Sequence, residues 1–421
     1  MENVICDNIQ NVIDNALCSA CGGCAGICPV NAITMQENAA GFLCANIDNS
    51  KCISCRKCIS ICPSNGLRLG ENLVGNIING YIGYAQNSTI RLQGQSGGIV
   101  TAIIQWMIEN HKVDAVVVSG FDCEKKRAKA FLASTVEEIL SAKGSHYTQT
   151  SPVELILKNQ DKKLAAVLLG CQTVCLEQIK KKYPKINLPI LTIGLICGGN
   201  LSGYVVDDLL KKAKIKESDT IKSFRFRDKA EGGWPGDIVI NSKARRVCIP
   251  KEKRMEIKPY YQNYRCMLCA EKMNQCCDIV VGDPWGISIP DEANGYSAII
   301  TRTMKGQNLL NEAVKEDIIS MQKEEPCKII EGQKIETALK EQLASYDLIL
   351  KKYGWIAPYK TFPEDKEIIY SEEMFDKLNY LRTLQYAKSK EEAKNIINKR
   401  KRNEYHPVRE VLYNIKKRII G

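Results

Sequence analysis

Histidine is scarce in this sequence of 421 residues, which contains only His111, His146 and His406. Zinc sites built on histidine, and catalytic triads centred on a histidine base, are therefore poor explanations for its chemistry. Long apolar runs are also absent, and no stretch reaches the ~18 uninterrupted apolar residues that a membrane span requires. The acidic N-terminal stretch lacks the basic flank and apolar run of a secretory signal. We therefore expect a cytoplasmic protein with no transmembrane span.

Cysteine, by contrast, is abundant: there are twenty, and ten of them precede residue 63. Disulfides explain this poorly, because cytosolic thiols stay reduced and a chain of this length does not need covalent staples. Thiols clustered at short spacing are instead typical of metal ligands. Cys6 and Cys44 lie outside the spacing pattern described next, and we interpret them as buried structural thiols.

The N-terminal cysteines form the motif C-x₂-C-x₂-C-x₃-C-P twice. In two-cluster ferredoxins the fourth cysteine of each run ligates the cluster that the other run holds. This predicts one [4Fe–4S] cluster on Cys18, Cys21, Cys24 and Cys62, and a second on Cys52, Cys55, Cys58 and Cys28. The alternative is zinc, which usually takes paired CxxC motifs a dozen or more residues apart rather than triple runs ending in CP. We therefore expect a small α+β bacterial-type ferredoxin domain over residues 1–75.

From residue 76 onwards short β-branched runs alternate with amphipathic stretches. Strand patterns occupy residues 77–85, 113–121, 163–170, 189–196 and 278–282, helix patterns residues 99–110, 173–184 and 204–213, and a hairpin pattern residues 223–240. This alternation predicts an α/β domain with a mixed, largely parallel sheet over residues 76–330.

Residues 331–421 have a charged, helical pattern without clustered cysteines and predict a helical C-terminal extension. Its last part, residues 390–421, holds ten Lys/Arg against four Asp/Glu. Such a charge run is more often a solvated helix face than a binding surface, so we do not expect a nucleic acid as partner.

Four further cysteines lie at positions where α/β proteins bind ligands. Cys171 and Cys197 each follow a predicted strand, and the carboxyl ends of parallel strands share one edge of a sheet. Cys266 and Cys269 form a CxxC just before the strand pattern at 278–282. These four thiols could hold a third cluster. Spacing alone leaves two alternatives open: Cys171 and Cys175 as core thiols, and the CxxC as a redox dithiol.

The motifs QSGGIVTAI, LGCQ, GLICGG, FRFRDK and CMLCAEKMNQCCDIVVGDPWG follow one another between residues 80 and 302. In this order they resemble the coenzyme F420 hydrogenase/dehydrogenase beta-subunit family, several members of which carry a ferredoxin module in front. Members are iron–sulfur flavoproteins that bind FAD, a [4Fe–4S] cluster and a hydride-exchanging substrate. The resemblance implies a flavoprotein domain in which Cys171, Cys197, Cys266 and Cys269 ligate the third cluster.

Two departures from the family pattern affect this interpretation. Cys276 and Cys277 stand where non-ligand residues are expected, so an exchange of ligand with Cys269 stays open. His146 takes a place where the pattern often has lysine, which would change contacts to the substrate or the flavin. That change weakens the transfer of deazaflavin specificity to this chain.

The flavin site is predicted from a glycine loop and from the resemblance. Ser96, Gly97 and Gly98 precede an apolar helix, where backbone N–H groups can hold a pyrophosphate, although such a loop is more often only a helix start. With the resemblance they become the first candidates for FAD contact. Arg227, Lys229 and Asp283 are further candidates, with a surface ion-pair cluster and a simple turn as the alternatives.

Iron–sulfur clusters pass single electrons, whereas a flavin accepts one or two. We therefore expect an oxidoreductase in which electrons enter at the ferredoxin module, cross the third cluster and reach FAD, which exchanges hydride with coenzyme F420 or another organic substrate; the reverse direction is equally allowed. The alternative is a non-catalytic electron-transfer subunit that serves a partner enzyme. Expected partners are a ferredoxin-type or subunit electron carrier and a small hydride substrate, in a homo- or hetero-oligomer.

Overall fold

The computed structural model describes residues 8–68, 72–362 and 370–404. Cys6 and the part of the basic tail beyond residue 404 therefore lie outside the described residues. Among the described residues, no helix is both long enough and apolar enough to cross a membrane.

The N-terminal region is built from short elements around the two cysteine runs. They are α1 (Gln10–Asp14), α2 (Gly23–Ile27), β1 (Ile33–Glu37), β2 (Leu43–Ile47), α3 (Lys57–Ser60) and β3 (Leu67–Arg68). Each run has a short helix at the same place, and the residues that precede these helices, Gly22 and Arg56, are both left-handed, with φ of 83° and 63°. β1 and β2 pair antiparallel. The sequence repeat is therefore also a repeat of backbone conformation.

The second region contains an eight-stranded sheet in the order β14-β4-β13-β12-β8-β7-β5-β6. The strands are β4 (Asn79–Ala85), β5 (Ala115–Asp122), β6 (Arg127–Ala133), β7 (Leu164–Leu168), β8 (Leu191–Leu195), β12 (Ile279–Gly282), β13 (Ser297–Thr301) and β14 (Ile319–Lys323). The five strand patterns read from the sequence all form strands of this sheet. The mixed α/β class is confirmed.

The expectation of a largely parallel sheet needs correction. Only β5, β7, β8 and β12 run parallel to one another, and β6, β13, β4 and β14 join antiparallel on the two sides. The alternation of strand and helix marks parallel crossovers, which is why the central strands were predictable. β6 follows β5 after a short turn and is half-exposed along most of its length, so it lacks the apolar alternation that would reveal it.

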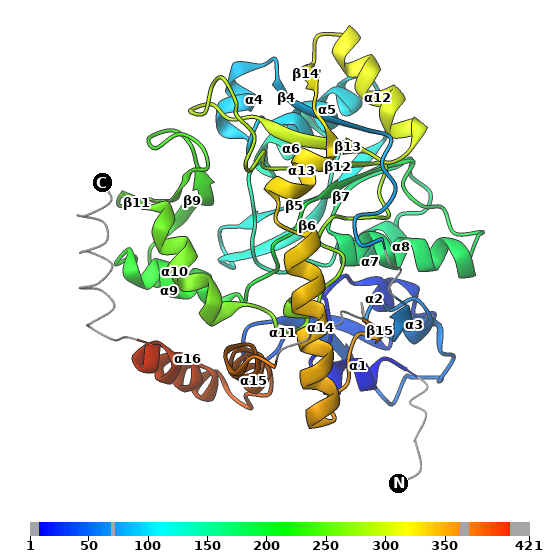
Figure 1. Ribbon diagram of the computed structural model, residues 1–421, viewed down its shortest axis with the longest axis vertical. Coiled ribbons are helices and arrows are strands. Elements are labelled where there is room, and N and C mark those ends of the chain that lie inside the picture. Colours follow the sequence, from blue (N-terminus) through cyan, green and yellow to red (C-terminus); the bar gives the residue numbers. More distant parts are fainter. Residues whose placement is uncertain (1–7, 69–71, 363–369, 405–421) are drawn as a thin grey trace.

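Helices cover both faces of the sheet (Figure 1). These are α4 (Ser88–Gln93), α5 (Ile99–Glu109), α6 (Val136–Ser141), α7 (Pro152–Lys158), α8 (Gly170–Lys182) and α12 (Met304–Lys315). Successive residues of β5 point to opposite faces. Val116 and Val118 pack in one core with α5 and α12, whereas Ala115 and Val117 pack in another with α7 and α8.

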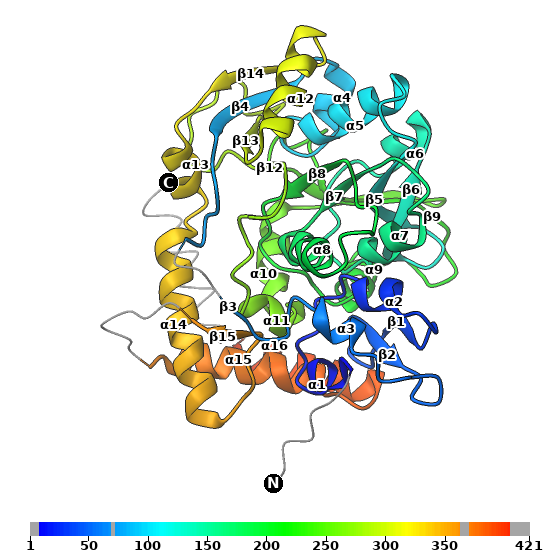
Figure 2. The same ribbon diagram turned by 90° about the vertical axis from the view of Figure 1, so that its right-hand side faces the viewer.

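The N-terminal region packs under α7 and α8, as Figures 1 and 2 both show. The N-terminal region approaches the large domain closely because the first cysteine run carries glycines. A Cβ atom on Gly22 would lie 2.8 Å from Cβ of Ser151, and one on Gly23 would lie 2.3 Å from Sγ of Cys175. In the second run the equivalent residues are Arg56 and Lys57, and Arg56 is exposed. The loop of the first run therefore faces the large domain, whereas in the second run Cys55 and Arg56 face outwards and Ser60 contacts Lys182 and Tyr183.

The remaining elements form a three-stranded sheet, its helices and the C-terminal segment. They are α9 (Tyr204–Lys212), β9 (Ile221–Asp228), β10 (Asp237–Ser242), β11 (Arg246–Ile249), α10 (Lys251–Tyr261), α11 (Tyr264–Met267), α13 (Pro326–Gly332), α14 (Glu336–Tyr353), β15 (Tyr359–Thr361), α15 (Glu372–Gln385) and α16 (Lys390–Glu404). The hairpin expected at 223–240 is present as β9 and β10. The C-terminal extension is helical but also contributes β15, which pairs with β3 of the N-terminal region. A three-residue strand whose partner lies far away in sequence leaves no periodic signal.

Candidate functional site

The first group of thiols lines a cavity inside the N-terminal region. Its walls include Cys18, Cys21, Cys24 and Cys62, the four cysteines assigned to one cluster. Cys175 of α8 lines the same cavity and is fully buried. The crossed pattern, in which the fourth cysteine comes from the other run, is thus reproduced in space for this group.

Burial governs the ionisation of these thiols. It raises the pKa of Cys18 to about 12, and it raises the pKa of Cys24 and Cys62 as well. Cys21 differs, because a hydrogen bond with the Cys175 thiol lowers its pKa to about 7 against the opposing effect of burial. Thiolates packed this closely, with little solvent, need a cationic centre to balance their charge.

The second group lies at the surface of the N-terminal region. Cys55 is exposed, Cys52 and Cys28 are half-buried, and the side chain of Ile53, next to Cys52, is 60% exposed. Burial raises the pKa of Cys58, and the charges of Cys55 and Cys52 raise it further, so these three thiols lie near one another. Cys28 packs in the same apolar cluster as Cys58 and accepts a bond of 3.3 Å from the Ala32 N–H.

The structure also brings Cys171, Cys197, Cys266 and Cys269 together. Burial raises the pKa of Cys171, Cys197 and Cys266, the last to about 12, and the charge of Cys269 adds to the rise in all three. Cys171 lies in the first turn of α8, not in a loop before the helix as the sequence predicted. Gly170, the first residue of α8, lets the backbone of the helix approach Glu271 closely, since a Cβ atom there would lie 2.0 Å from the Glu271 carbonyl oxygen.

Backbone N–H groups point at three of these four sulfurs. Gly199 donates to Cys197 and Asn200 to Cys266, both at 3.4 Å, and Glu271 donates to Cys269 at 3.3 Å. N–H···S bonds of this kind are among the features that tune iron–sulfur clusters. The residues of this group therefore suit a cluster better than they suit a redox dithiol, in which only two thiols take part.

Cys276 and Cys277 are not part of this group. Cys277 is buried under Gly194 and donates from Sγ to the Asn274 carbonyl oxygen at 3.2 Å. Cys276 is exposed. The bond of Cys277 to Asn274 and the exposed position of Cys276 do not favour an exchange of ligand with Cys269.

Within the described residues, no group of three or more His, Cys, Asp or Glu side chains is close enough to hold a single metal ion. A tetrahedral zinc site with Zn–S bonds of about 2.3 Å would bring its sulfurs within about 4 Å of one another. A four-iron cluster holds its thiolates further apart, because iron and sulfide stand between them.

Most residues predicted for flavin contact are engaged with one another. Asp283 accepts hydrogen bonds from Ser96 at 2.6 Å, from Trp234 at 2.8 Å and from both Nη atoms of Arg227 at 2.7 and 2.9 Å. Lys229 donates to three backbone carbonyl oxygens, among them that of Ser96. The bonded side chains form a buried network, not the surface ion-pair cluster that the sequence left open.

The glycine loop is similarly occupied. The Gly97 N–H donates to the Ser297 hydroxyl at 3.0 Å, and the Gly98 N–H donates to the Gln95 carbonyl oxygen at 2.9 Å. Gly98 is left-handed, with φ of 76°, and its place is the N-cap of α5. These N–H groups hold the loop itself, so their predicted contact with FAD stays a prediction.

Unpartnered polar atoms gather instead on the segment that precedes α7. The buried atoms without a hydrogen bond include Nδ1 of His146, Oγ1 of Thr148, both amide atoms of Gln149 and Oγ of Ser151. Buried polar groups are nearly always bonded, so these atoms are available to a polar ligand or to ordered water. Thr148 forms a bridge to Leu201 in the loop after Cys197. The segment therefore adjoins the third group of thiols, and it fits a flavin.

His146 was also predicted to contact the flavin. Of the residues in that prediction, it alone has a buried side-chain atom, Nδ1, without a hydrogen bond within the described residues. Burial lowers its pKa to about 4, the Ala142 carbonyl oxygen opposes the shift, and the charge of Arg225 adds to it. The imidazole is therefore neutral at pH 7, unlike a lysine at this position.

Thr148 and Gln149 were not identified from the sequence because nothing in their spacing marks them as binding residues. Cys175 carried a signal, its i, i+4 spacing from Cys171 on one helix face.

Known protein families match most of the chain. Residues 81–158 match the N-terminal part of the beta subunit of coenzyme F420 hydrogenase/dehydrogenase, and residues 161–326 match the C-terminal part of the same protein. Residues 17–65 match the 4Fe-4S dicluster domain.

Similar proteins come from methanogenic archaea. F420-dependent formate dehydrogenase 1 subunit beta of Methanococcus maripaludis is 26% identical over 62% of this chain and 65% of its own length. Coenzyme F420-dependent sulfite reductase of Methanocaldococcus jannaschii is 22% identical over 83% of this chain and 54% of its own length. Coenzyme F420 hydrogenase subunit beta of Methanothermobacter thermautotrophicus is 25% identical over 64% of this chain and 94% of its own length. This chain thus covers less than two thirds of the length of the first two of these relatives.

A chain in a solved structure of the F420-reducing [NiFe] hydrogenase complex from Methanosarcina barkeri has a similar fold. The TM-score is 0.51 at 18% identity, and the match covers 68% of this chain and 94% of that one. At this identity the likeness concerns the fold.

Proposed function

The chain belongs to the coenzyme F420 hydrogenase/dehydrogenase beta-subunit family and has a 4Fe-4S dicluster domain in front, and from this premise we propose that it is an iron–sulfur flavoprotein oxidoreductase. Its clusters supply one-electron transfer, and bound FAD supplies two-electron hydride exchange with an organic substrate. Coenzyme F420 is the first candidate substrate, because the relatives above are named for it.

The observation that carries the proposal is the position of α8 between two groups of thiols. Cys171 in its first turn belongs to the third group, and Cys175 one turn later packs against Cys21 of the first group. A single helical turn rises about 5.4 Å. Two clusters held by these groups lie close enough for the chain to connect them without a partner protein.

The surface position of the second group supports it as the point of electron exchange with an external carrier. Cys55 and Ile53 are exposed, whereas Cys21 of the first group is buried against the large domain. We infer that the carrier meets the second run, and that the first run passes electrons inwards.

The third group is proposed to hold a [4Fe–4S] cluster on Cys171, Cys197, Cys266 and Cys269, beside the flavin. Thr148 and Gln149 have free polar atoms suited to a flavin edge or its phosphates, and His146 offers a neutral nitrogen. The network of Ser96, Arg227, Lys229 and Asp283 then holds the loops that enclose this site. Direct contacts of FAD with Ser96, Gly97, Gly98, Arg227, Lys229 and Asp283 remain part of the prediction.

Replacement of Cys266 by Ala tests the order of this relay. The variant should retain about eight irons per chain and bind flavin, but its clusters should no longer reduce the flavin. Iron content and the anaerobic flavin absorbance after addition of a one-electron donor measure both effects. C277A removes a buried cysteine outside the group and should keep about twelve irons. Flavin reduction at the normal rate in C266A would refute the order proposed.

A second candidate function is that of a relay subunit without flavin. It is favoured because several relatives are named as beta subunits. In that case flavin would be absent from a preparation whose clusters are intact, and electrons would pass from the third group to a partner protein.

A further inference from the structure

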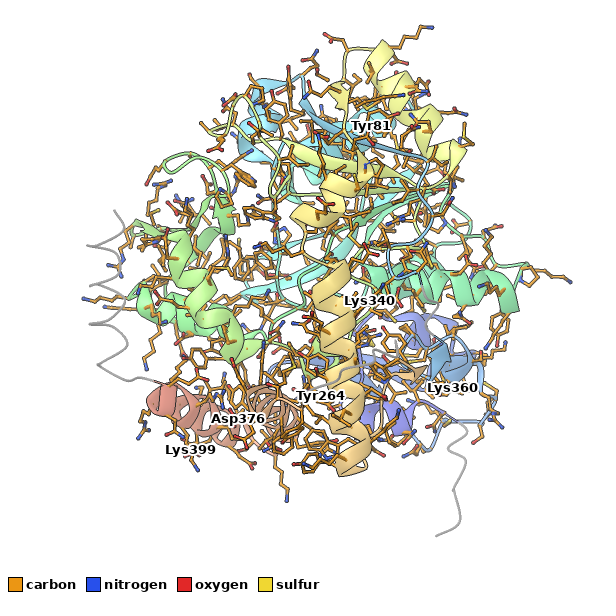
Figure 3. The ribbon with its side chains drawn as sticks, in the orientation of Figure 1. Tyr81, Tyr264, Lys340, Lys360, Asp376 and Lys399 are labelled. Carbon is orange, nitrogen blue, oxygen red and sulfur yellow. The ribbon has the colours of Figure 1, made fainter. Side chains whose placement is uncertain are left out.

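Arg265 lies between the first and third groups of thiols. It is the second residue of α11, directly before Cys266, and it is 1% exposed. Its neighbour Tyr264 is labelled in the lower half of the molecule in Figure 3. An arginine so deeply buried normally requires an anionic partner, because removing its charge from water is costly.

The hydrogen bonds of Arg265 lead to the first group. Nε donates to the Ser64 hydroxyl at 3.0 Å, and Nη2 donates to the Pro63 carbonyl oxygen at 3.4 Å. Pro63 and Ser64 follow Cys62 directly. The same Nη2 also donates to the hydroxyl of Tyr359 at 3.2 Å, so β15 takes part in holding the side chain.

None of these hydrogen bonds neutralises the charge of Arg265. All of its described acceptors are neutral oxygens, no carboxylate pairs with it within the described residues, and its Nη1 has no hydrogen bond. The ionisable groups that interact with its charge include the thiols of the third group and the buried carboxyl of Glu271, whose pKa burial raises and the charge of Arg265 lowers. Cys62 directly precedes two of the residues that accept these bonds, and Cys266 directly follows Arg265, so the chain holds the guanidinium beside a ligand of each group.

We propose that Arg265 is a positioning residue for electron transfer whose buried positive charge is shared between the cluster on Cys18, Cys21, Cys24 and Cys62 and the cluster on Cys171, Cys197, Cys266 and Cys269. This inference rests on the proposed function, because it requires both clusters. A reduced cluster carries one more negative charge than an oxidised one, so a nearby cation stabilises the reduced form and raises the potential. One charge that acts on both clusters moves both potentials in the same direction and so raises them together without separating them.

The test is a potentiometric titration of the whole chain, with the clusters followed by electron paramagnetic resonance. R265Q should make reduction of both clusters at least tenfold less favourable, which is a fall of about 59 mV for one electron. R265K keeps the charge and should shift both potentials by less than a third of that amount. If R265Q does not accumulate, R265M takes its place, since an apolar side chain of similar volume often replaces a buried charge without loss of stability.

Arg302 provides the matched control. It is 4% exposed, donates to the carbonyl oxygens of Asn76 and Met273 at 2.6 Å, and has an unpartnered Nε, but it does not contact either group of ligands. R302Q should destabilise the fold and leave both potentials unchanged. A purely structural role of Arg265 would make R265Q behave as R302Q does.

The outcomes separate this inference from the proposed function. About twelve irons with unchanged potentials in R265Q or R265M would overturn the role of Arg265 and leave the relay intact. A shift confined to one cluster would overturn the sharing of the charge. About eight irons in the unaltered protein would contradict the third cluster, and the shared role of Arg265 with it.

Discussion

Asp283 shows at the scale of one residue how the loops around the proposed flavin site are held. Burial alone would raise its pKa, but the charge of Arg227 and the bonds from Arg227, Ser96 and Trp234 outweigh burial and hold the pKa below its usual value. A carboxylate with a lowered folded-state pKa stabilises the fold fully above its unfolded pKa of about 3.9. That contribution is lost as the pH falls through the folded-state pKa.

D283N should therefore destabilise the protein at pH 7 by about 3 kcal/mol, because it leaves Arg227 buried without its anionic partner. Below about pH 4 the difference from the unaltered protein should shrink, because the Asp283 carboxyl takes up a proton first in the unfolded protein, and it should vanish once the pH is below the lowered folded-state pKa. Urea unfolding of the loaded protein at several pH values measures both effects. D376N, which removes a 59% exposed partner of Arg400, should change stability by less than about 1 kcal/mol. If the difference in unfolding free energy between D283N and the unaltered protein stayed constant down to the lowest pH, the stabilising role of the ionised Asp283 carboxylate would be contradicted.

At the scale of elements, the first cysteine run and α8 fit together only because the run carries glycine. Gly23→Ala places a methyl group against Sγ of Cys175, where the separation would be 2.3 Å. Overpacking of this kind typically costs about 1–3 kcal/mol. Lys57 holds the equivalent place in the outward-facing run, so K57A should change stability by no more than about 0.5 kcal/mol.

The double variant G23A/C175A makes this contact testable as a coupling. Removing Sγ of Cys175 opens the space that the new methyl group needs, so the double variant should be more stable than the sum of the two single changes predicts. Thermal unfolding under anaerobic conditions of the four proteins of the cycle gives the coupling energy. If the effects of G23A and C175A on stability were additive, Gly23 of the first cysteine run would not contact Cys175 of α8.

The same elements show what the sequence could and could not predict. The cysteine runs were predictable because cluster binding imposes a spacing on neighbouring residues. The central strands were predictable because β-branched runs alternate with helices. Arg265 acquires its role only from packing between segments far apart in the chain, and no local periodicity records such contacts. The pairing of β15 with β3 was missed for the same reason.

The residues predicted for flavin contact illustrate a different limit. Ser96, Arg227 and Asp283 do meet in the structure, but the sequence could not tell a network that bonds to itself from one that bonds a ligand. The unpartnered atoms of Thr148 and Gln149 became visible only once every neighbour was placed.

At the scale of the whole molecule, the thiol groups form a path from the surface to the interior of the large domain. The second group is exposed at Cys55, the first is buried beside α8, and the third adjoins the polar segment that begins at His146. In the proposed function this order lets a single chain accept electrons one at a time and deliver them in pairs. The relay subunit would have the same path, but without a flavin at its inner end.

The content of iron and flavin per chain, measured after purification without oxygen, tests this account most directly. The account predicts about twelve irons and about one FAD per chain. About twelve irons without flavin would contradict the coupling of one- and two-electron transfer within this chain and would favour the relay subunit. About eight irons would contradict the third cluster on which the path depends.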